Sequence, residues 1–290
     1  MALNLGGGSM TSNFNSLYLG QAQSLLNQSL LRLSSGKRIN RPSDDPGGLA
    51  VSMRLQNALT VTSATKQNIE NAKSYTDTQD AALKSAGDVL TRMSTIKTLY
   101  GDSGSGLNST DKANYASEFR ELQAQLNAFK SEKFSSMSLF SSSGISRNVY
   151  ISTQGSTGAT ISVGTLDYSA ALSVASGVNL SSQRYGANAA SISDITSTQL
   201  NTAISNVASL RAEAGATSSR LEFSSDYLST SMIHLEEANS RIMDVDVAEE
   251  TTNMAKYNLQ VYAASAALVQ SNLNMSIVLD LLNFNSMSRR

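Results

Sequence analysis

LNTAISNVASLRAEAGATSSRLEFSSDYLSTSMIHLEEANSRI, residues 200–242, is the stretch that decides the fold, because an apolar side chain recurs at every seventh position. The series is Leu200, Val207, Ala214, Leu221, Leu228, Leu235 and Ile242. A sustained seven-residue apolar repeat is typical of a helix that packs lengthwise against other helices. We therefore expect a long helix from near Ile192 to Ile242, as part of an α-helical bundle or coiled coil.

Four other segments have helical periodicity. Residues 17–35 carry an apolar stripe, and Gly36 ends it. A second helix is expected from Pro46, with Asp45 as its N-cap, to about Tyr100. A third helix is expected to begin at a cap formed by Ser109 or Thr110 and to reach Phe129. The stripes of the two terminal helices contain Leu19, Leu26 and Leu33 near the N-terminus, and Met254, Val261, Leu268, Met275 and Leu282 near the C-terminus.

The centre of the chain has a different pattern. Val149 and Ile151 alternate with polar residues, as do Ile161 and Val163, around a Gly-containing loop. This pattern predicts a β-hairpin, followed by a mostly irregular segment at 164–189. We therefore expect a mainly α, elongated antiparallel bundle with paired N- and C-terminal helices and a small central β-hairpin region. The expected parts are 1–43 with 244–290, 44–130 with 190–243, and 131–189.

Composition excludes several function classes. The formal net charge is −1, so bulk electrostatic capture of nucleic acid is not expected. There is no cysteine and only one histidine, His234, which excludes thiol chemistry and Cys-ligated metal sites. No apolar run is long enough to cross a membrane, and the N-terminus does not resemble a cleaved signal peptide. We find no catalytic constellation, so we expect no enzyme, no cofactor and no metal.

Two long motifs at opposite ends of the chain resemble one family. LRLSSGKRIN at 31–40 and SDDPGGLAVSMRL at 43–55 are similar to the N-terminal conserved region of bacterial flagellin. SRIMDVDVAEETTNMAKYNLQVYAASAALVQSN at 240–272, with VLDLL at 278–282, is similar to the C-terminal region of the same family. The two matches stand in the family's order and at the family's ends.

The resemblance implies a subunit of the extracellular flagellar filament, which functions in motility by self-assembly. In the family the two terminal helices pair into an inner coiled coil, and the chain is exported without a cleaved signal by the flagellar type III apparatus. The implied partners are other copies of the chain, an export chaperone that covers the C-terminal helix, and the cap and junction proteins of the flagellum. No nucleic acid and no membrane are expected as partners.

The resemblance also assigns residues outside the terminal helices. The loop with Pro42, Asp44, Asp45 and Pro46 corresponds to the spoke that joins the inner and outer layers in the family. In flagellins that the vertebrate Toll-like flagellin receptor detects, an arginine, an apolar residue and a glutamate make contact. Matching the motifs places Arg92, Ile96 and Glu121 at those positions.

Two alternatives are carried beside the filament subunit. NRPSDDP at 40–46, with its two prolines, is also the form found in the hook–filament junction protein, a relative of flagellin. A different class is a secreted, amphipathic, membrane-active or adhesive protein, because the C-terminal helix could lie on a bilayer.

Overall fold

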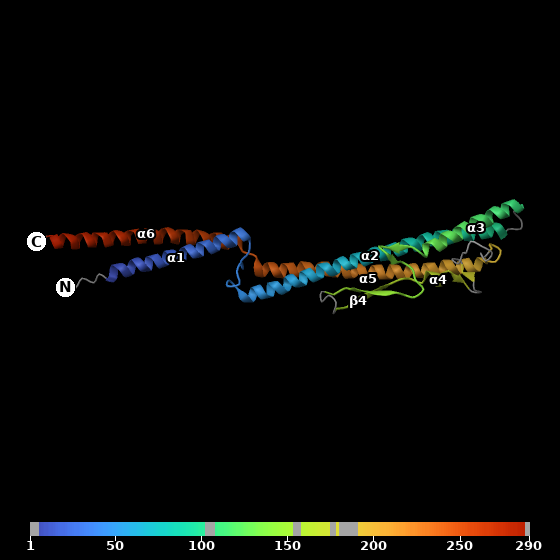
Figure 1. Ribbon diagram of the computed structural model, residues 1–290, viewed down its shortest axis with the longest axis horizontal. Helices are drawn as coiled ribbons and strands as arrows, with labels where there is room; N and C mark the ends of the chain where they lie inside the picture. The colour runs from blue at the N-terminus through green and yellow to red at the C-terminus, as the bar shows by residue number, and fades with distance from the viewer. Residues whose placement is uncertain (1–5, 102–107, 153–157, 175–177, 180–190, 288–290) are drawn as a thin grey trace. The chain divides into compact units, whose positions relative to one another are not determined.

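The computed structural model describes residues 6–101, 108–152, 158–174, 178–179 and 191–287 (Figure 1). Its helices are α1 (Gly6–Ser35), α2 (Pro46–Gly101), α3 (Ser109–Phe129), α4 (Tyr168–Ala171), α5 (Ser197–Met243) and α6 (Val247–Met287). Its strands are β1 (Lys133–Phe134), β2 (Met137–Ser138), β3 (Ser146–Tyr150), β4 (Thr160–Gly164), β5 (Ser173–Val174) and β6 (Val178–Asn179). The predicted mainly α fold with a small antiparallel β region is confirmed.

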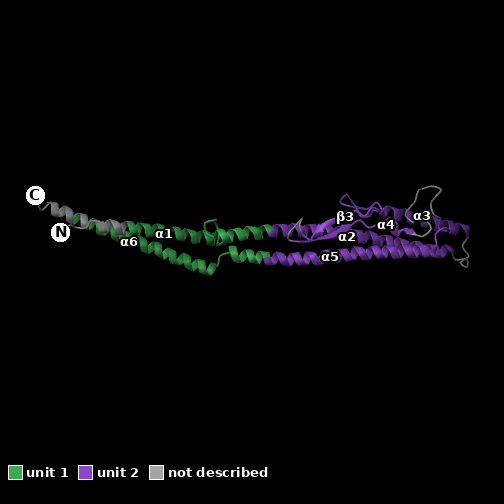
Figure 2. Ribbon diagram, turned by 90° about the horizontal axis from the view of Figure 1, so that it is seen from below, with its two compact units in different colours: residues 1–57, 235–290 green, residues 58–234 purple. Residues whose placement is uncertain are grey.

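The chain forms two compact units (Figure 2). The terminal unit comprises residues 1–57 and 235–290, and the central unit comprises residues 58–234. The three-part division expected from the sequence stays a prediction.

In the terminal unit, α1 and α6 pair in antiparallel directions. Asn15 donates to the carbonyl oxygen of Ala267 at 3.4 Å, while the Ser29 hydroxyl donates to Glu250. The predicted pairing of the terminal helices is therefore confirmed. Helix α1 begins at Gly6, well before the expected residue 17, and ends at Ser35 as expected. Gly36, with a φ of +69°, adopts the left-handed conformation that commonly follows a helix.

Side-chain caps set the helix starts. Asp45 accepts from the Gly48 backbone N–H at 2.8 Å, so α2 begins at Pro46 as expected. The expected cap of α3 is wrong by one residue, because Asn108 rather than Ser109 or Thr110 accepts the backbone N–H of Asp111 at 2.8 Å. The Asp111 side chain in turn accepts the backbone N–H of Asn108. This reciprocal pair of hydrogen bonds is a capping box, which favours Asn108 as the cap.

The core of the central unit lies among α2, α3 and α5. The seven-residue series on α5 is buried from Leu200 to Leu228, with Leu200, Leu221 and Leu228 fully buried. The Arg211 guanidinium donates to both Asp80 oxygens, at 2.8 and 3.2 Å, and Ser218 donates to Asp77 at 3.0 Å. These contacts place α5 antiparallel to α2 within the unit.

Three antiparallel strand pairs occur in the described residues: β1–β2, β3–β4 and β5–β6. The predicted hairpin is β3–β4, in which Val149 lies opposite Ile161. The expectation that 164–189 is mostly irregular is wrong for the part that contains α4, β5 and β6, while residues 175–177 and 180–189 lie outside the described residues. Leu166, Tyr168 and Leu172 are buried in the core around α4. Tyr168 donates to the carbonyl oxygen of Leu126 at 3.2 Å and thereby joins α4 to the last turn of α3.

Candidate interaction surface

One face of α1 packs against one face of α6. The predicted seam residues on these faces are half-buried: Leu19, Leu26 and Leu33 on α1, and Met254, Val261, Leu268 and Met275 on α6. The side chain of the remaining predicted residue, Leu282, lies outside those that the structure describes. The seam residues are therefore partly covered within the chain, and their role in contacts with other copies stays a prediction.

A buried polar cluster lies in this seam. Glu250 is 6% exposed, accepts the Ser29 hydroxyl, and has its other carboxylate oxygen 3.9 Å from the Arg32 guanidinium. Among the described residues, the buried Nε of Arg32 has no hydrogen-bond partner. A shift of α1 along α6 would leave the Glu250 charge buried without these partners, which is strongly unfavourable.

A second apolar stripe lies on the opposite face of α6 and is exposed. Its members follow one another at steps of three, four or seven residues: Leu259, Tyr262, Val269, Leu273 and Ile277. Leu259 is 70% exposed and Tyr262 is 67% exposed. Helix α1 adds exposed apolar side chains of its own: Phe14, Leu17, Tyr18, Leu30 and Leu31. A groove of about 400 Å³ follows the α1–α6 seam between Tyr18 and Gln260.

This stripe was not predicted from the sequence. The strict seven-residue series on α6 identifies only the side that pairs with α1. A helix that is apolar on more than one face has more than one partner or is buried all round, and this signal could have revealed the second stripe.

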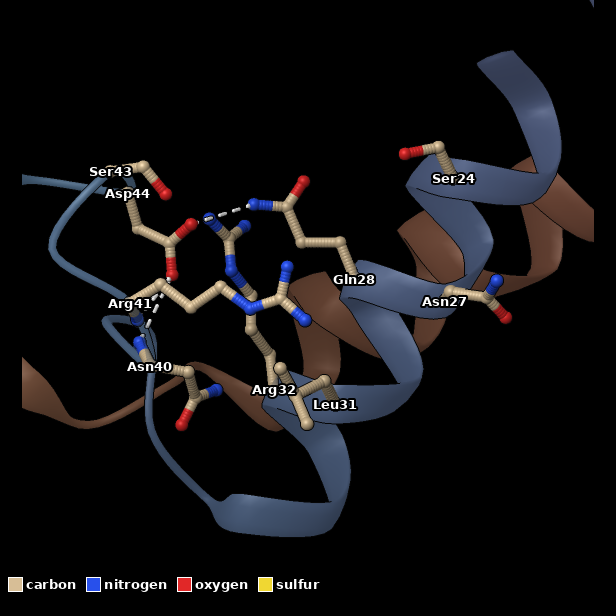
Figure 3. Close-up of a pocket in the computed structure, with 9 residues that line it drawn as sticks. All are labelled: Ser24, Asn27, Gln28, Leu31, Arg32, Asn40, Arg41, Ser43 and Asp44. Atoms are coloured by element: carbon tan, nitrogen blue, oxygen red, sulfur yellow. Dashed lines mark hydrogen bonds between the residues drawn. The ribbon is translucent and has the colours of Figure 1, made fainter. Parts of the chain in front are cut away.

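The loop after α1 is held by Asp44. One carboxylate oxygen accepts the backbone N–H groups of Arg41 at 2.9 Å and Asn40 at 3.1 Å, and the other accepts from Gln28 of α1 at 3.2 Å. The hydrogen bonds from Arg41 and Asn40 lower the pKa of Asp44 below its ordinary value. Figure 3 shows these bonds at a polar pocket of about 440 Å³, which Arg32 also lines.

The same loop is tied to the end of α5. Arg38 donates through its guanidinium to the carbonyl oxygen of Ile242 at 2.9 Å, and its backbone N–H bonds the carbonyl oxygen of Met243. The backbone N–H of Val245 donates to Gly36 at 3.1 Å. The two connecting segments of the terminal unit, 36–45 and 244–246, thus form one hydrogen-bonded junction.

Two prolines and two aspartates of this loop were predicted to belong to the spoke. Pro46 starts α2, Asp45 caps it, and Asp44 organises the turn, while Pro42 is exposed. A Cβ at Gly48 would lie 2.9 Å from Cδ1 of Ile39 and 2.9 Å from Cγ of Asp45, so a larger residue there would displace these two side chains. Their role as a connecting spoke stays a prediction.

The predicted receptor residues do not form one surface. Arg92 and Glu121 are exposed, and Arg92 pairs with Glu118 at 2.7 Å. Ile96 is 0% exposed, so the prediction that it contacts a receptor is wrong. Its side chain belongs to the apolar core, and contact from outside would require the bundle to open.

Other classes of site were sought within the described residues. No three His, Cys, Asp or Glu side chains there lie close enough together to hold a metal ion. None of the described helices combines the length and apolar character that crossing a bilayer needs. His234 is exposed on α5.

Comparisons with known proteins point to one family. The model of the bacterial flagellin N-terminal helical region matches residues 9–144, and the model of the flagellin C-terminal helical region matches residues 198–282. Flagellin FlaB2 of Treponema pallidum is 28% identical over 288 residues, covering 94% of this chain and 98% of that protein. Flagellin of Bacillus subtilis is 28% identical over 288 residues, covering 91% of this chain and 95% of that protein.

One solved structure shares the fold. A putative flagellar hook-associated protein from Vibrio parahaemolyticus superposes with a TM-score of 0.58 and 16% identity. The match covers 69% of this chain and all of that chain. At this identity the likeness concerns the fold alone.

Proposed function

Since the chain belongs to the bacterial flagellin family, we propose that it is a structural subunit that assembles with copies of itself into the filament of the bacterial flagellum. The observation that carries the assembly step is the exposed apolar stripe on α6. The flagellin family is a family of structural proteins, and the proposal assigns this chain no catalytic step.

The stripe requires a partner for a physical reason. Exposed apolar area gains about 25 cal/mol per Å² when it leaves water, and Tyr262 and Leu273 alone present large side chains at 67% and 52% exposure. Within the described chain α6 packs on one face only, against α1. The opposite face is available to other copies. Contacts between different patches on successive copies do not close on themselves and generate a helical polymer.

A charge on the stripe tests the proposal. Val269→Asp places a carboxylate where a neighbouring copy would bury it, at a cost of several kcal/mol. Since Val269 is 57% exposed in the single chain, the monomer should keep its helix content by circular dichroism. We expect the critical concentration for polymerisation to rise at least about 100-fold, at about 1.4 kcal/mol per factor of ten.

Asn274→Asp is the matched control. It adds the same charge to α6 five residues away, about 140° around the helix from Val269, and retains the oxygen that accepts from Gln270. This variant should polymerise like the parent in sedimentation and electron microscopy. Normal filaments from Val269→Asp, or equal loss in both variants, would contradict the assignment of the stripe.

The remaining partners belong to the same proposal. An exposed apolar face on α6 needs cover before assembly, which supports a chaperone that binds the C-terminal helix before export. The proposal also includes cap and junction proteins of the flagellum as partners and a location outside the cell, and the family membership supports it. A chaperone that binds Val269→Asp as tightly as the parent would not use this stripe.

Recognition by the vertebrate Toll-like flagellin receptor is retained in a narrower form. It rests on the exposed Arg92 and Glu121, without the buried Ile96. Arg92→Ala removes the charge and should lower the response of a receptor reporter assay to the monomer. A silent parent monomer, or a variant as active as the parent, would remove the receptor from the set of partners.

A further inference from the structure

An apolar pocket of about 470 Å³ lies on the central unit, between α2 and the hairpins β1–β2 and β3–β4. Six side chains make up its apolar lining: Ala72, Tyr75, Phe134, Met137, Val149 and Val163. Four exposed residues make up its polar lining: Asn68, Asn71, Ser135 and Arg147. Pockets for small molecules have volumes of about 300–1,000 Å³, a mostly apolar lining and a few polar groups. This pocket has all three properties.

Contacts within the unit hold the apolar lining in place. The Tyr75 hydroxyl donates to the carbonyl oxygen of Ser138 at 2.8 Å, and the Tyr75 ring meets the Phe134 ring edge to face, with 6.1 Å between the ring centroids. Phe134 lies opposite Met137 in the β1–β2 register, so both side chains are on one face of that hairpin. A site whose walls are fixed before binding loses less conformational entropy when a ligand enters.

Arg147 places a positive charge on an otherwise apolar face of the β3–β4 hairpin. It lies opposite Val163 and two residues before Val149, so these three side chains share a face. The described residues supply no ion-pair partner for Arg147. Burial raises the pKa of Tyr75, and the charge of Arg147 acts in the opposite direction, so the guanidinium lies within electrostatic reach of the pocket.

The lining selects one class of ligand. Among the described residues, Arg147 is the one charged side chain in the lining, so the pocket favours an anion over a cation. A guanidinium donates two parallel hydrogen bonds to a carboxylate, and the amides of Asn68 and Asn71 offer further donors. The apolar lining stabilises a ligand whose remaining surface is hydrocarbon, because that surface leaves water on binding.

We propose that this pocket binds a small apolar molecule with a single carboxylate, the carboxylate on Arg147 and the apolar part against Tyr75 and Phe134. The inference goes beyond the proposed function, because the pocket is complete in one chain and lies outside the unit that contains α6. The ligand contacts both α2 and the hairpins. Its binding therefore stabilises the folded arrangement that joins them.

Octanoate is the probe, and octan-1-ol is its uncharged counterpart. The full chain, kept as a monomer with isotope-labelled methionine methyl groups, is titrated with each compound and followed by nuclear magnetic resonance. Met137 reports the pocket, whereas Met254 and Met275 report binding to the terminal helices. The loss of one signal in Met137→Leu assigns the pocket signal. We expect octanoate to shift it at lower concentrations than the other two signals, and octan-1-ol to bind at least about fivefold more weakly.

Substitutions of Arg147 test the role of its charge. Arg147→Gln should weaken octanoate binding about fivefold to tenfold and leave octan-1-ol binding unchanged, because only the charged ligand loses a partner. Arg147→Lys keeps the charge and should retain affinity within about threefold of the parent. Lys133→Gln is the matched control. Lys133 is exposed on β1 and does not line the pocket, so the same loss of charge there should leave octanoate binding unchanged.

Ala72→Leu tests the apolar part of the site. The larger side chain occupies pocket volume from α2 and should weaken the binding of both probes, while the helix content measured by circular dichroism stays the same. An unshifted Met137 signal, equal affinity for the two probes, or equal effects of Arg147→Gln and Lys133→Gln would overturn the proposal. A Met137 signal that responds to protein concentration but not to octanoate would assign the pocket to a neighbouring copy and also overturn it. Each of these outcomes leaves the filament assignment standing, since the titration uses the monomer.

Discussion

Gln79 is the residue on which the attachment of the hairpins to α2 depends. It is 2% exposed, and its amide nitrogen donates to the carbonyl oxygens of Leu139 at 2.8 Å and Gly164 at 3.1 Å. Carbonyl oxygens only accept hydrogen bonds, so the amide must be the donor. Gln79→Glu changes one NH₂ group to an oxygen and preserves the size and shape of the side chain. It therefore isolates the contribution of these donors.

The expected loss can be worked out. An ionised carboxylate cannot face two carbonyl oxygens, so the new carboxyl must stay protonated in the folded chain. Keeping a group of ordinary pKa about 4.3 protonated at pH 7 costs about 3.7 kcal/mol, at about 1.36 kcal/mol per pKa unit. One hydrogen bond is also lost, at about 1 kcal/mol, because the protonated acid has a single donor. The total at pH 7 is about 4–5 kcal/mol.

The pH dependence gives the sign of the effect. The folded-state pKa of the new carboxyl lies above the unfolded-state value. The protonated acid therefore supports the fold fully below about pH 4, and this support is lost as the pH rises through the folded-state pKa. Relative to the parent, thermal unfolding at pH 7 should occur about 10–20 °C lower, at about 2–4 °C per kcal/mol for a unit of this size. At pH 4 the difference should shrink to a few degrees.

Gln67→Glu is the control for this measurement. Gln67 is exposed on the same helix, so the same chemical change there should alter stability by at most about 0.5 kcal/mol at either pH. Unfolding is followed by circular dichroism. If Gln79→Glu lowered the midpoint by the same amount at pH 4 and pH 7, or by no more than Gln67→Glu, the amide would not hold the hairpins.

Two further outcomes are expected. Tyr168→Phe removes the hydroxyl that donates to the carbonyl oxygen of Leu126, which is one of the last four carbonyl groups of α3. The substitution should destabilise the central unit by about 1–2 kcal/mol in thermal or denaturant unfolding, and an unchanged midpoint would contradict this. The lowered pKa of Asp44 means that its carboxylate stabilises the junction above the unfolded-state pKa of 3.8, and that this stabilisation is lost as the pH falls through the folded-state pKa. As the pH falls, hydrogen exchange at the backbone amide of Arg41 should therefore become faster relative to the rate expected for an unprotected amide at the same pH. Asp44→Asn should abolish this pH-dependent loss of protection. An identical pH response in the variant and the parent would refute the role of Asp44.

Local features of the fold were predictable because they depend on neighbours in the chain. Pro46 after Asp45 predicts the start of α2, and the seven-residue series from Leu200 predicts the buried side of α5. Features that depend on distant segments were not predictable. Gln79 is polar and fully covered by the fold, and the carbonyl groups that it binds lie 60 and 85 residues away in the chain. Ile96 matched a surface motif, but only the packed bundle shows that it points inward.

The candidate site illustrates the same limit on a single helix. The α6 seam recurs strictly every seven residues, and that period keeps one side of a helix facing one partner. The exposed stripe contains one step of seven residues, from Tyr262 to Val269, and Ser276 ends that series, so a search for long seven-residue repeats passes over it. Both stripes are apolar, and no property of the residues themselves distinguishes the one that the chain satisfies internally. Only the position of α1, fixed by the Ser29–Glu250 contact, assigns the first stripe to the fold and leaves the second for other copies.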